Sequence, residues 1–308
     1  RIYQYAMKIG MYFLPWRVPQ LLEGPGAIRR LPQLIQQQGC HKILISTGSY
    51  LLSHGVLNPL FEALEAADIA YVLHAGIPAN PSDEDVERGV RLYHENNCDS
   101  LLAFGGGSTM DTCKCVGNLL TNPGRAEDYQ GWELVKHPAP YKIGCPTISG
   151  TGSESSRTGV LCNQAKNLKL GMNSDFTMFD QLVLDPDLSV TVPRDKFFYT
   201  GIDTYMHCFE SLTGHYRNTV VDALATKAIE LSREIFNSAD MMLPENREKL
   251  MIASYLGGMA AGFVGCVHPL SAGLSMVLDI HHGLANLLAL SVLGDIYRRQ
   301  HAEVMAMM

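Results

Sequence analysis

The segment Leu101-Leu102-Ala103-Phe104-Gly105-Gly106-Gly107-Ser108-Thr109-Met110-Asp111 indicates the fold class most directly. Its first four residues are apolar, which is typical of a buried strand. Ser108, with Asp111 three residues later, indicates the capped start of a helix. The three glycines between them lack the Cβ atoms that would keep a phosphate away from backbone amides. We therefore predict a strand, a tight turn and a helix whose N-terminus can bind a pyrophosphate. A turn with a purely structural role is the alternative.

Short apolar runs alternate with helical patterns around this segment, from about Lys42 to Asp185. The runs at residues 43–45, 70–73, 101–104, 142–145 and 182–184 predict strands. This alternation is typical of an α/β domain with a largely parallel sheet, to which we assign residues 1–185. From Pro193 onward, apolar residues recur at helical intervals over 220–236, 245–261 and 282–297. We therefore predict an all-α C-terminal domain over residues 186–308, because Pro186 interrupts the last strand.

Four residues of the helical half form a candidate metal site. Asp203 and His207 are four residues apart in a stretch without proline, so on a helix they share one face. His268 and His282 lie near expected helix ends, where side chains from different helices can converge. Three neutral imidazoles and one carboxylate suit Fe(II), Zn(II) or a neighbouring first-row ion. A surface Asp–His pair and a core histidine are the alternative interpretations.

These segments and others along the chain resemble the iron-containing (group III) alcohol dehydrogenases. The resemblance rests on Gly24-Pro25-Gly26, Asn80-Pro81, the 105–111 loop, Pro146-Thr147-Ile148-Ser149-Gly150-Thr151-Gly152-Ser153-Glu154, Leu184-Asp185-Pro186, Thr200-Gly201-Ile202-Asp203 and His282-Gly283-Leu284-Ala285-Asn286. Within the family, residues 129–132, 169–175 and 198–201 and the doubled His281-His282 are most similar to the 3-deoxy-manno-octulosonate 8-oxidase branch. The resemblance implies that the α/β domain binds a dinucleotide and that the all-α domain binds a metal.

By this resemblance, the cofactor is NAD or NADP, and one divalent ion, Fe2+ or Zn2+, completes the site. The residues implied to contact the cofactor are Gly105, Gly106, Gly107, Ser108, Thr147, Thr151 and Lys169. The implied metal ligands are Asp203, His207, His268 and His282. The ion would polarise an alcohol or carbonyl oxygen while a hydride passes between the substrate carbon and the nicotinamide. A capped turn and a solvated lysine are the alternative interpretations of the threonines and of Lys169.

Two positions depart from the family pattern. NAD-using members commonly carry an Asp after the first core strand, but here Thr47-Gly48-Ser49 follows it, so nothing repels a 2′-phosphate. No Arg or Lys follows in this loop to bind that phosphate, so we expect Gly48 to lie beside the cofactor and the protein to use both NAD and NADP, with NAD slightly favoured. Ala272 stands where many members have a histidine, which leaves His281 as a candidate proton relay. His281 is also interpretable as part of a helix cap.

The leading hypothesis is a metal-dependent, NAD(P)-linked alcohol dehydrogenase that interconverts an alcohol and its aldehyde or ketone. Its candidate substrates are simple alcohols, polyols and the terminal hydroxyl of a sugar acid such as 3-deoxy-manno-octulosonate. A dehydroquinate-synthase-like lyase or cyclase, a glycerol-dehydrogenase-like enzyme and a non-catalytic binding protein on the same scaffold are the alternatives. Lyase sites are richer in Lys and Arg than the segments around Asp203 and His268, which favours the dehydrogenase.

Composition limits the partners. The chain has 308 residues, a net charge of −7 and no basic run, which argues against nucleic acid as a partner. The apolar run at 9–16 is too short to span a bilayer, so we expect no membrane partner. Eight cysteines without paired zinc spacing predict free thiols in a reducing, cytoplasmic compartment. We expect a small-molecule alcohol or aldehyde substrate and consider a homodimer. Compared with the family, we also expect further helices after Met308 and a short gap before Val264.

Overall fold

The computed structural model describes residues 17–163, 166, 168–214, 217–261, 265–278 and 280–307. The chain forms two compact units. The α/β unit comprises Val18–Ile148 and Ser153–Thr191, and the helical unit comprises the residues from Val192 onward with Arg17 and the short segment Ser149–Gly152. The predicted boundary after Asp185 therefore precedes the division at Thr191 and stays a prediction. The apolar run at 9–16 and Val264 lie outside the described residues.

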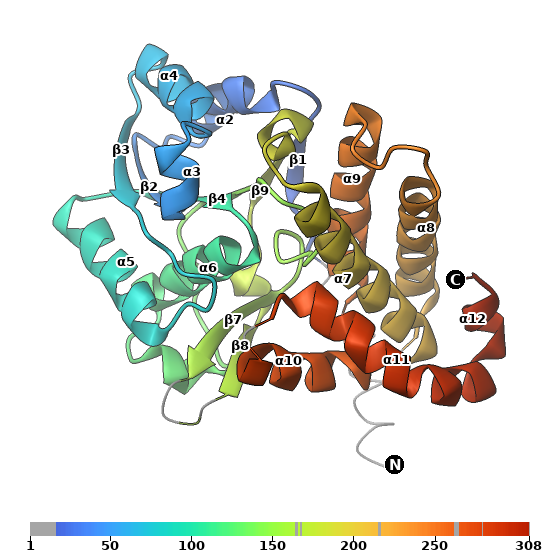
Figure 1. Ribbon diagram of the computed structural model, residues 1–308. Helices are drawn as coiled ribbons and strands as arrows, with labels where there is room; N and C mark the ends of the chain where they lie inside the picture. The colour runs from blue at the N-terminus through green and yellow to red at the C-terminus, as the bar shows by residue number, and fades with distance from the viewer. Residues whose placement is uncertain are drawn as a thin grey trace. The chain divides into compact units, whose positions relative to one another are not determined.

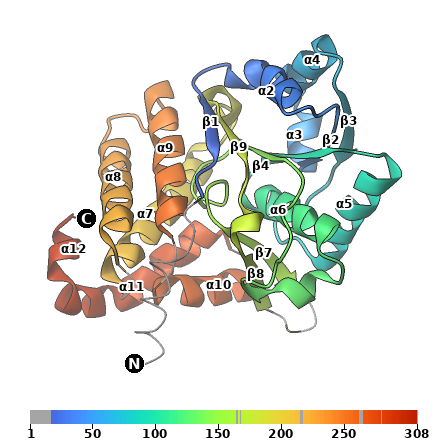
Figure 2. The same ribbon diagram turned by 180° about the vertical axis from the view of Figure 1, so that it is seen from behind.

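The α/β unit is built on a six-stranded sheet in which every pair of neighbouring strands is parallel. The strand order is β1-β9-β6-β4-β2-β3, and Figures 1 and 2 label each of these strands except β6. The strands are β1 (Gln20–Glu23), β2 (Lys42–Thr47), β3 (Ala70–His74), β4 (Ser100–Gly105), β6 (Lys142–Pro146) and β9 (Gln181–Leu184). All five predicted strands and the parallel sheet are confirmed, whereas the edge strand β1 was not predicted.

Helices cover both faces of this sheet because each parallel connection has to cross back over the sheet. On one face, Leu31 and Ile35 of α2 and Leu60 of α4 share a hydrophobic cluster with Ile43 and Ile45 of β2. On the other face, α5 and α6 pack against each other and against the central strands (Figure 1). The helices of this unit are α2 (Leu31–Gln37), α3 (Ser49–Ser53), α4 (Asn58–Ala66), α5 (Asp83–Glu95) and α6 (Gly107–Thr121), with 3-10 turns η1 (Ala27–Arg30), η2 (Ala126–Tyr129), η3 (Asp175–Thr177) and η4 (Pro186–Ser189).

A second, three-stranded sheet completes the α/β unit. Its strands are β5 (Gly131–Trp132), β7 (Thr158–Asn163) and β8 (Leu168–Asn173), in the order β5-β8-β7. β7 and β8 are antiparallel, and β5 runs parallel to β8. None of these strands was predicted.

The helical unit contains α7 (Arg194–Thr213), α8 (Thr219–Phe236), α9 (Pro244–Ala260), α10 (Val267–Leu278), α11 (His282–Gln300) and α12 (Ala302–Met307). The three predicted helices correspond to α8, α9 and α11, and the helical character of this half is confirmed. α8 and α9 lie side by side (Figures 1 and 2), and Ala225, Ala228 and Ala253 allow their close approach in a core that includes Phe209. Among the described helices, none combines the length and the apolar character that a membrane crossing requires.

The segment Ser149–Gly152 is held by helices α7 and α9. The backbone amides of Gly150 and Gly152 donate to Ser254 Oγ at 2.9 and 3.3 Å. Thr204 Oγ1 donates to the carbonyl of Gly150 at 2.7 Å. A Cβ atom on Gly150 would lie 2.1 Å from the carbonyl oxygen of Thr200, so only glycine allows this approach.

Candidate metal centre

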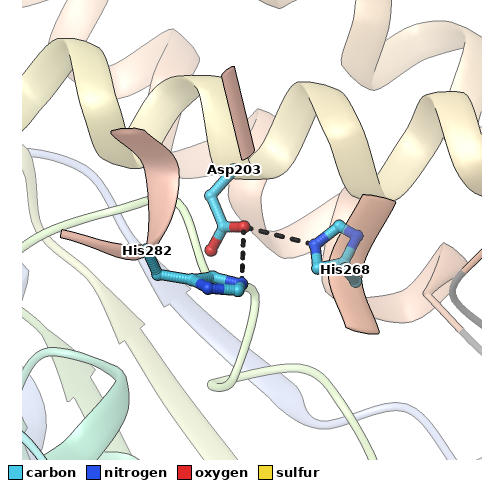
Figure 3. Close-up of side chains that lie close together, drawn as sticks. All are labelled: Asp203, His268 and His282. Carbon is cyan, nitrogen blue, oxygen red and sulfur yellow. Dashed lines mark hydrogen bonds and ion pairs between the residues drawn. The ribbon is translucent and has the colours of Figure 1, made fainter. Parts of the chain in front are cut away.

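Three of the four predicted metal ligands converge within the helical unit. Asp203 projects from α7, which has no proline between its ends, while His268 lies in the first turn of α10 and His282 is the first residue of α11. One ligand atom from each of these three side chains lies within 4.8 Å of the others. Asp203 Oδ1 is 3.3 Å from His268 Nε2 and 3.6 Å from His282 Nε2 (Figure 3). The two imidazoles therefore face one carboxylate oxygen.

His207, the fourth predicted ligand, lies beside this group and is not part of it. Its ring stacks on that of His268, with ring centroids 4.2 Å apart and an interplanar angle of 16°. Its Nδ1 is buried, and no hydrogen-bond partner for it exists among the described residues. Burial and the neighbouring His268 lower the pKa of His207 to about 3. The ring is therefore neutral and has a nitrogen lone pair available for a ligand.

Asp203 is the acidic residue of the group, and only 2% of its surface is exposed. Burial opposes its ionisation, but His207, His282 and His268 together hold the pKa of Asp203 well below its ordinary range. Burial lowers the pKa of His268, yet hydrogen bonds to Asp203 and Glu210 outweigh it and raise that pKa to about 9. Once His268 gives up its Nε2 proton to an incoming cation, the ionised carboxylate and the imidazoles around it form an oxygen and nitrogen donor set that suits a borderline divalent ion.

Two further residues support these side chains, and the sequence interpretation missed both. Asn286 Nδ2 donates to Asp203 Oδ1 at 2.7 Å, and its Oδ1 is buried with no partner in the part of the chain that the structure describes. Glu210 accepts the Nδ1–H of His268. Helical spacing could have indicated both, because Glu210 is seven residues after Asp203 and Asn286 is four residues after His282.

His281 caps the N-terminus of α11. Its Nδ1 accepts from the backbone amide of Gly283 at 3.2 Å, and burial and then Lys196 lower its pKa. Gly283 packs so closely on α7 that a Cβ atom would lie 1.8 Å from the carbonyl oxygen of Tyr199. The cap and this approach fix the direction in which His282 leaves the helix. The structure therefore gives His281 a capping role, and proton relay stays a prediction.

The glycine loop between β4 and α6 begins the helix differently from the prediction. The N-cap is Gly106, which makes no side-chain capping bond, so the predicted cap by Ser108 is wrong. The Ser108 hydroxyl donates instead to the carbonyl of Ala79 at 2.6 Å, and Asp111 accepts from Ser153 Oγ. Gly105 adopts φ +159°, and a Cβ atom there would lie 2.6 Å from Thr109 Oγ1.

Three of the predicted cofactor segments gather at one edge of the large sheet. β2 pairs with β4 at Thr47 and Phe104, so Gly48 and the glycine loop both follow the carboxyl ends of neighbouring strands. The amide of Thr147 donates to the carbonyl of Gly105 at 3.0 Å, which places Thr147 beside that loop. This edge is where parallel sheets bind nucleotides. Lys169 lies on β8 of the smaller sheet, and Thr151 belongs to the segment held by α7 and α9.

Comparisons with known proteins agree with this arrangement. The profile described as "Iron-containing alcohol dehydrogenase" matches residues 19–186, and that of the "Fe-containing alcohol dehydrogenase family, C-terminal" matches residues 197–308. The chain is 30% identical over 282 residues to the NAD-dependent methanol dehydrogenase of Bacillus methanolicus, covering 89% of this chain and 72% of that protein.

Two solved structures are similar to this chain over most of its length. The alcohol dehydrogenase from Oenococcus oeni is similar with a TM-score of 0.90 and 27% identity, over 96% of this chain and 79% of that one. The sulfoacetaldehyde reductase from Bifidobacterium kashiwanohense, in complex with NAD+, gives a TM-score of 0.82 and 25% identity, over 92% and 77% of the two chains. Because the two profiles together match most of its length, the chain belongs to the iron-containing alcohol dehydrogenase family.

Proposed function

We propose that this protein is a metal-dependent, NAD(P)-linked alcohol dehydrogenase that interconverts an alcohol and its aldehyde or ketone by hydride transfer. The observation that carries the proposal is the convergence of Asp203, His268 and His282 within 4.8 Å in a member of this family. A dehydroquinate-synthase-like lyase is less consistent with this chain, since such sites are richer in Lys and Arg than the segments around Asp203 and His268.

We assign four ligands to one divalent ion, Fe2+ or Zn2+: Asp203, His207, His268 and His282. The donor set fits such an ion, and the ring of His207 lies beside the three converging side chains, stacked on His268 with ring centroids 4.2 Å apart. When bound, the ion would serve as a Lewis acid toward the substrate oxygen. Asn286 holds Asp203 through a 2.7 Å hydrogen bond, which keeps the carboxylate turned toward the two imidazoles.

We propose NAD or NADP as the cofactor, bound at the carboxyl edge of the large sheet. The N-terminus of α6 has no side-chain cap, so its backbone amides are suited to a pyrophosphate. The residues assigned to the cofactor are Gly48, Gly105, Gly106, Gly107, Ser108, Thr147, Thr151 and Lys169. The NAD named for two of the relatives favours this class of cofactor. The Gly48 loop contains neither an acid nor a base, and we expect use of both cofactors with NAD slightly favoured.

The substrate class is an alcohol or aldehyde of small size. The terminal hydroxyl of a sugar acid such as 3-deoxy-manno-octulosonate is the finer candidate, because two segments that resemble that branch lie side by side: Gly131 of β5 pairs with Met172 of β8. A glycerol-dehydrogenase-like activity is the alternative. Eight free thiols favour a cytoplasmic enzyme, and a homodimer stays a proposal.

Reconstitution tests the proposal. The purified protein is loaded with Fe(II) or Zn(II) and incubated with NAD+ or NADP+ and a panel of simple alcohols, glycerol and 3-deoxy-manno-octulosonate, while elemental analysis measures bound metal. Asp203→Ala and His282→Ala should contain substoichiometric metal and lose turnover. Asp195→Ala, which removes an exposed carboxylate from the first turn of the same helix α7, should keep both. Full metal content and full activity in Asp203→Ala and His282→Ala would refute the assignment.

A further inference from the structure

Glu210 is a fully buried carboxylate at which three helices of the helical unit meet. It projects from α7 and has no exposed surface. Its Oε1 accepts from the backbone amide of Val267 at 2.5 Å and from the hydroxyl of Tyr297, on α11, at 3.2 Å. Its Oε2 accepts from Nδ1 of His268 and lies 3.4 Å from the amide of the same residue, in the first turn of α10. Both carboxylate oxygens are therefore committed to donors.

The surrounding backbone is arranged to admit this carboxylate. A Cβ atom on Gly265 would lie 2.7 Å from Glu210 Oε1 and 3.0 Å from the hydroxyl oxygen of Tyr297, so a larger residue would displace both groups. The amide of Cys266 donates to the Tyr297 hydroxyl at 3.2 Å. A buried negative charge costs free energy unless donors surround it, and the N-terminus of α10 supplies both donors and a partial positive charge.

The contact with His268 determines which nitrogen of that ring is available. A carboxylate only accepts hydrogen bonds, so Nδ1 of His268 must carry a hydrogen when it bonds to Glu210. The other nitrogen, Nε2, is the one that faces Asp203 at 3.3 Å. Metal-binding histidines commonly donate their second ring nitrogen to a carboxylate, which fixes the ring and raises its basicity.

We propose that Glu210 is a positioning residue, which holds His268 in the orientation and the tautomer that present Nε2 toward Asp203 and His282. This inference rests on the proposed metal-dependent function. Glu210 does not itself contact the ion or the substrate. It acts through His268, and it also ties the first turn of α10 to α7 and, through Tyr297, to α11.

The test compares Glu210→Gln with Tyr297→Phe in the full chain. Gln has the same shape but replaces one acceptor oxygen with a donor and removes the charge. Phe removes the hydroxyl that donates to Glu210 and accepts from the Cys266 amide, and it leaves the Glu210–His268 contact in place. Zn(II) affinity is measured by competition with a chromophoric chelator, and NMR on protein with 15N-labelled histidine follows the downfield Nδ1 proton of His268 with and without Zn(II). Circular dichroism confirms folding.

We expect Glu210→Gln to bind Zn(II) roughly 10–100-fold more weakly and to lose the downfield Nδ1 proton. Tyr297→Phe should keep the Nδ1 signal and bind Zn(II) within about twofold of wild type. Equal losses of Zn(II) affinity in both variants would mean that the cluster is purely structural. Unchanged Zn(II) affinity with an unchanged Nδ1 signal in Glu210→Gln would also overturn the inference. Either outcome would leave the proposed function intact. If the wild-type protein binds no Zn(II), both this inference and the proposed metal-dependent function are wrong. If Glu210→Gln does not fold, Glu210→Asp replaces it, since the shorter side chain keeps the charge but draws it away from His268, and the same losses are expected.

Discussion

Substitution of Gly283 by alanine tests whether close helix packing sets the geometry of the metal-binding residues. The added Cβ atom would lie 1.8 Å from the carbonyl oxygen of Tyr199, whereas real Cβ atoms stay beyond 3.0 Å. α11 must therefore move away from α7 by about 1.2 Å, the difference between these two distances. The obstacle is backbone, so no side-chain rotation relieves it. His282 precedes Gly283 directly, and the same shift carries its imidazole away from Asp203.

The expected losses follow from this shift. Overpacking of this kind costs about 1–3 kcal/mol of folding free energy. Misplacement of an active-site group by about 1 Å can cost about 10²-fold in rate. We therefore expect Gly283→Ala to lower the free energy of unfolding by about 1–3 kcal/mol, to weaken Zn(II) binding and to reduce turnover about 100-fold. Urea titration followed by circular dichroism, chelator competition and steady-state kinetics measure the three effects.

Gly294→Ala is the matched control, because Gly294 lies in the same helix and a Cβ atom there would meet nothing within 4 Å. Alanine should stabilise the helix at this position by about 0.5–1 kcal/mol and leave Zn(II) affinity unchanged. Wild-type stability and Zn(II) affinity in Gly283→Ala would refute the reasoning. So would equal losses in the two variants.

Three further substitutions test other parts of the α/β unit. Burial lowers the pKa of His74 to about 4 from its ordinary 6.5, so as the pH falls the unfolded chain gains the proton first. Between about pH 7.5 and about pH 5, wild type should therefore lose about 2 kcal/mol more stability than His74→Gln. Urea titrations in which both proteins lose the same free energy of unfolding over this pH range would contradict this. Gly48→Asp should suppress turnover with NADP and spare turnover with NAD, because a carboxylate repels the 2′-phosphate. The substitution fits sterically, since a Cβ atom there meets nothing closer than 3.8 Å. Wild type that rejects NADP as strongly as the variant does would contradict this prediction. Lys114→Met should destabilise the protein by about 3 kcal/mol or more, since the carbonyls of Ser156 and Thr158 would lose a charged donor at 2.9 and 2.8 Å and the buried Asp111 would lose its neighbouring cation. An unchanged thermal unfolding midpoint would argue against this.

The strands that sequence predicted correctly are those with a continuous apolar signal. β2, β4 and β9 are buried along nearly their whole length, so their side chains form uninterrupted apolar runs. β1 is mostly exposed and contains Gln20 and Glu23, and β5 has two residues, so neither has a pattern to detect. The pairing of β1 with β9 joins residues about 160 positions apart, and local periodicity does not contain that information.

The candidate site was predictable where helical spacing or a shared motif contained the signal. Asp203 and His207 lie four residues apart on α7, and His268 and His282 lie near helix ends, as the sequence indicated. Helical spacing puts Glu210 on the same face as Asp203, but its role was overlooked because the donors it accepts from lie on two other helices, which only the folded chain brings together. The predicted Ser108 cap failed for a related reason, since the hydroxyl bonds the distant carbonyl of Ala79 in place of a local amide.

The segment Ser149–Gly152 sets an order in which this protein can mature on the ribosome. Gly150 bonds to Ser254, which is 104 residues further along the chain. At roughly 5–20 residues per second, the ribosome needs roughly 5–20 s to make that partner. The α/β strands before the segment can pair during that interval, but the loop that follows β6 cannot take its final conformation until α9 has left the exit tunnel. Nascent chains stalled before Ser254 should therefore be cut by proteases at 149–152, and chains stalled well beyond α9 should resist.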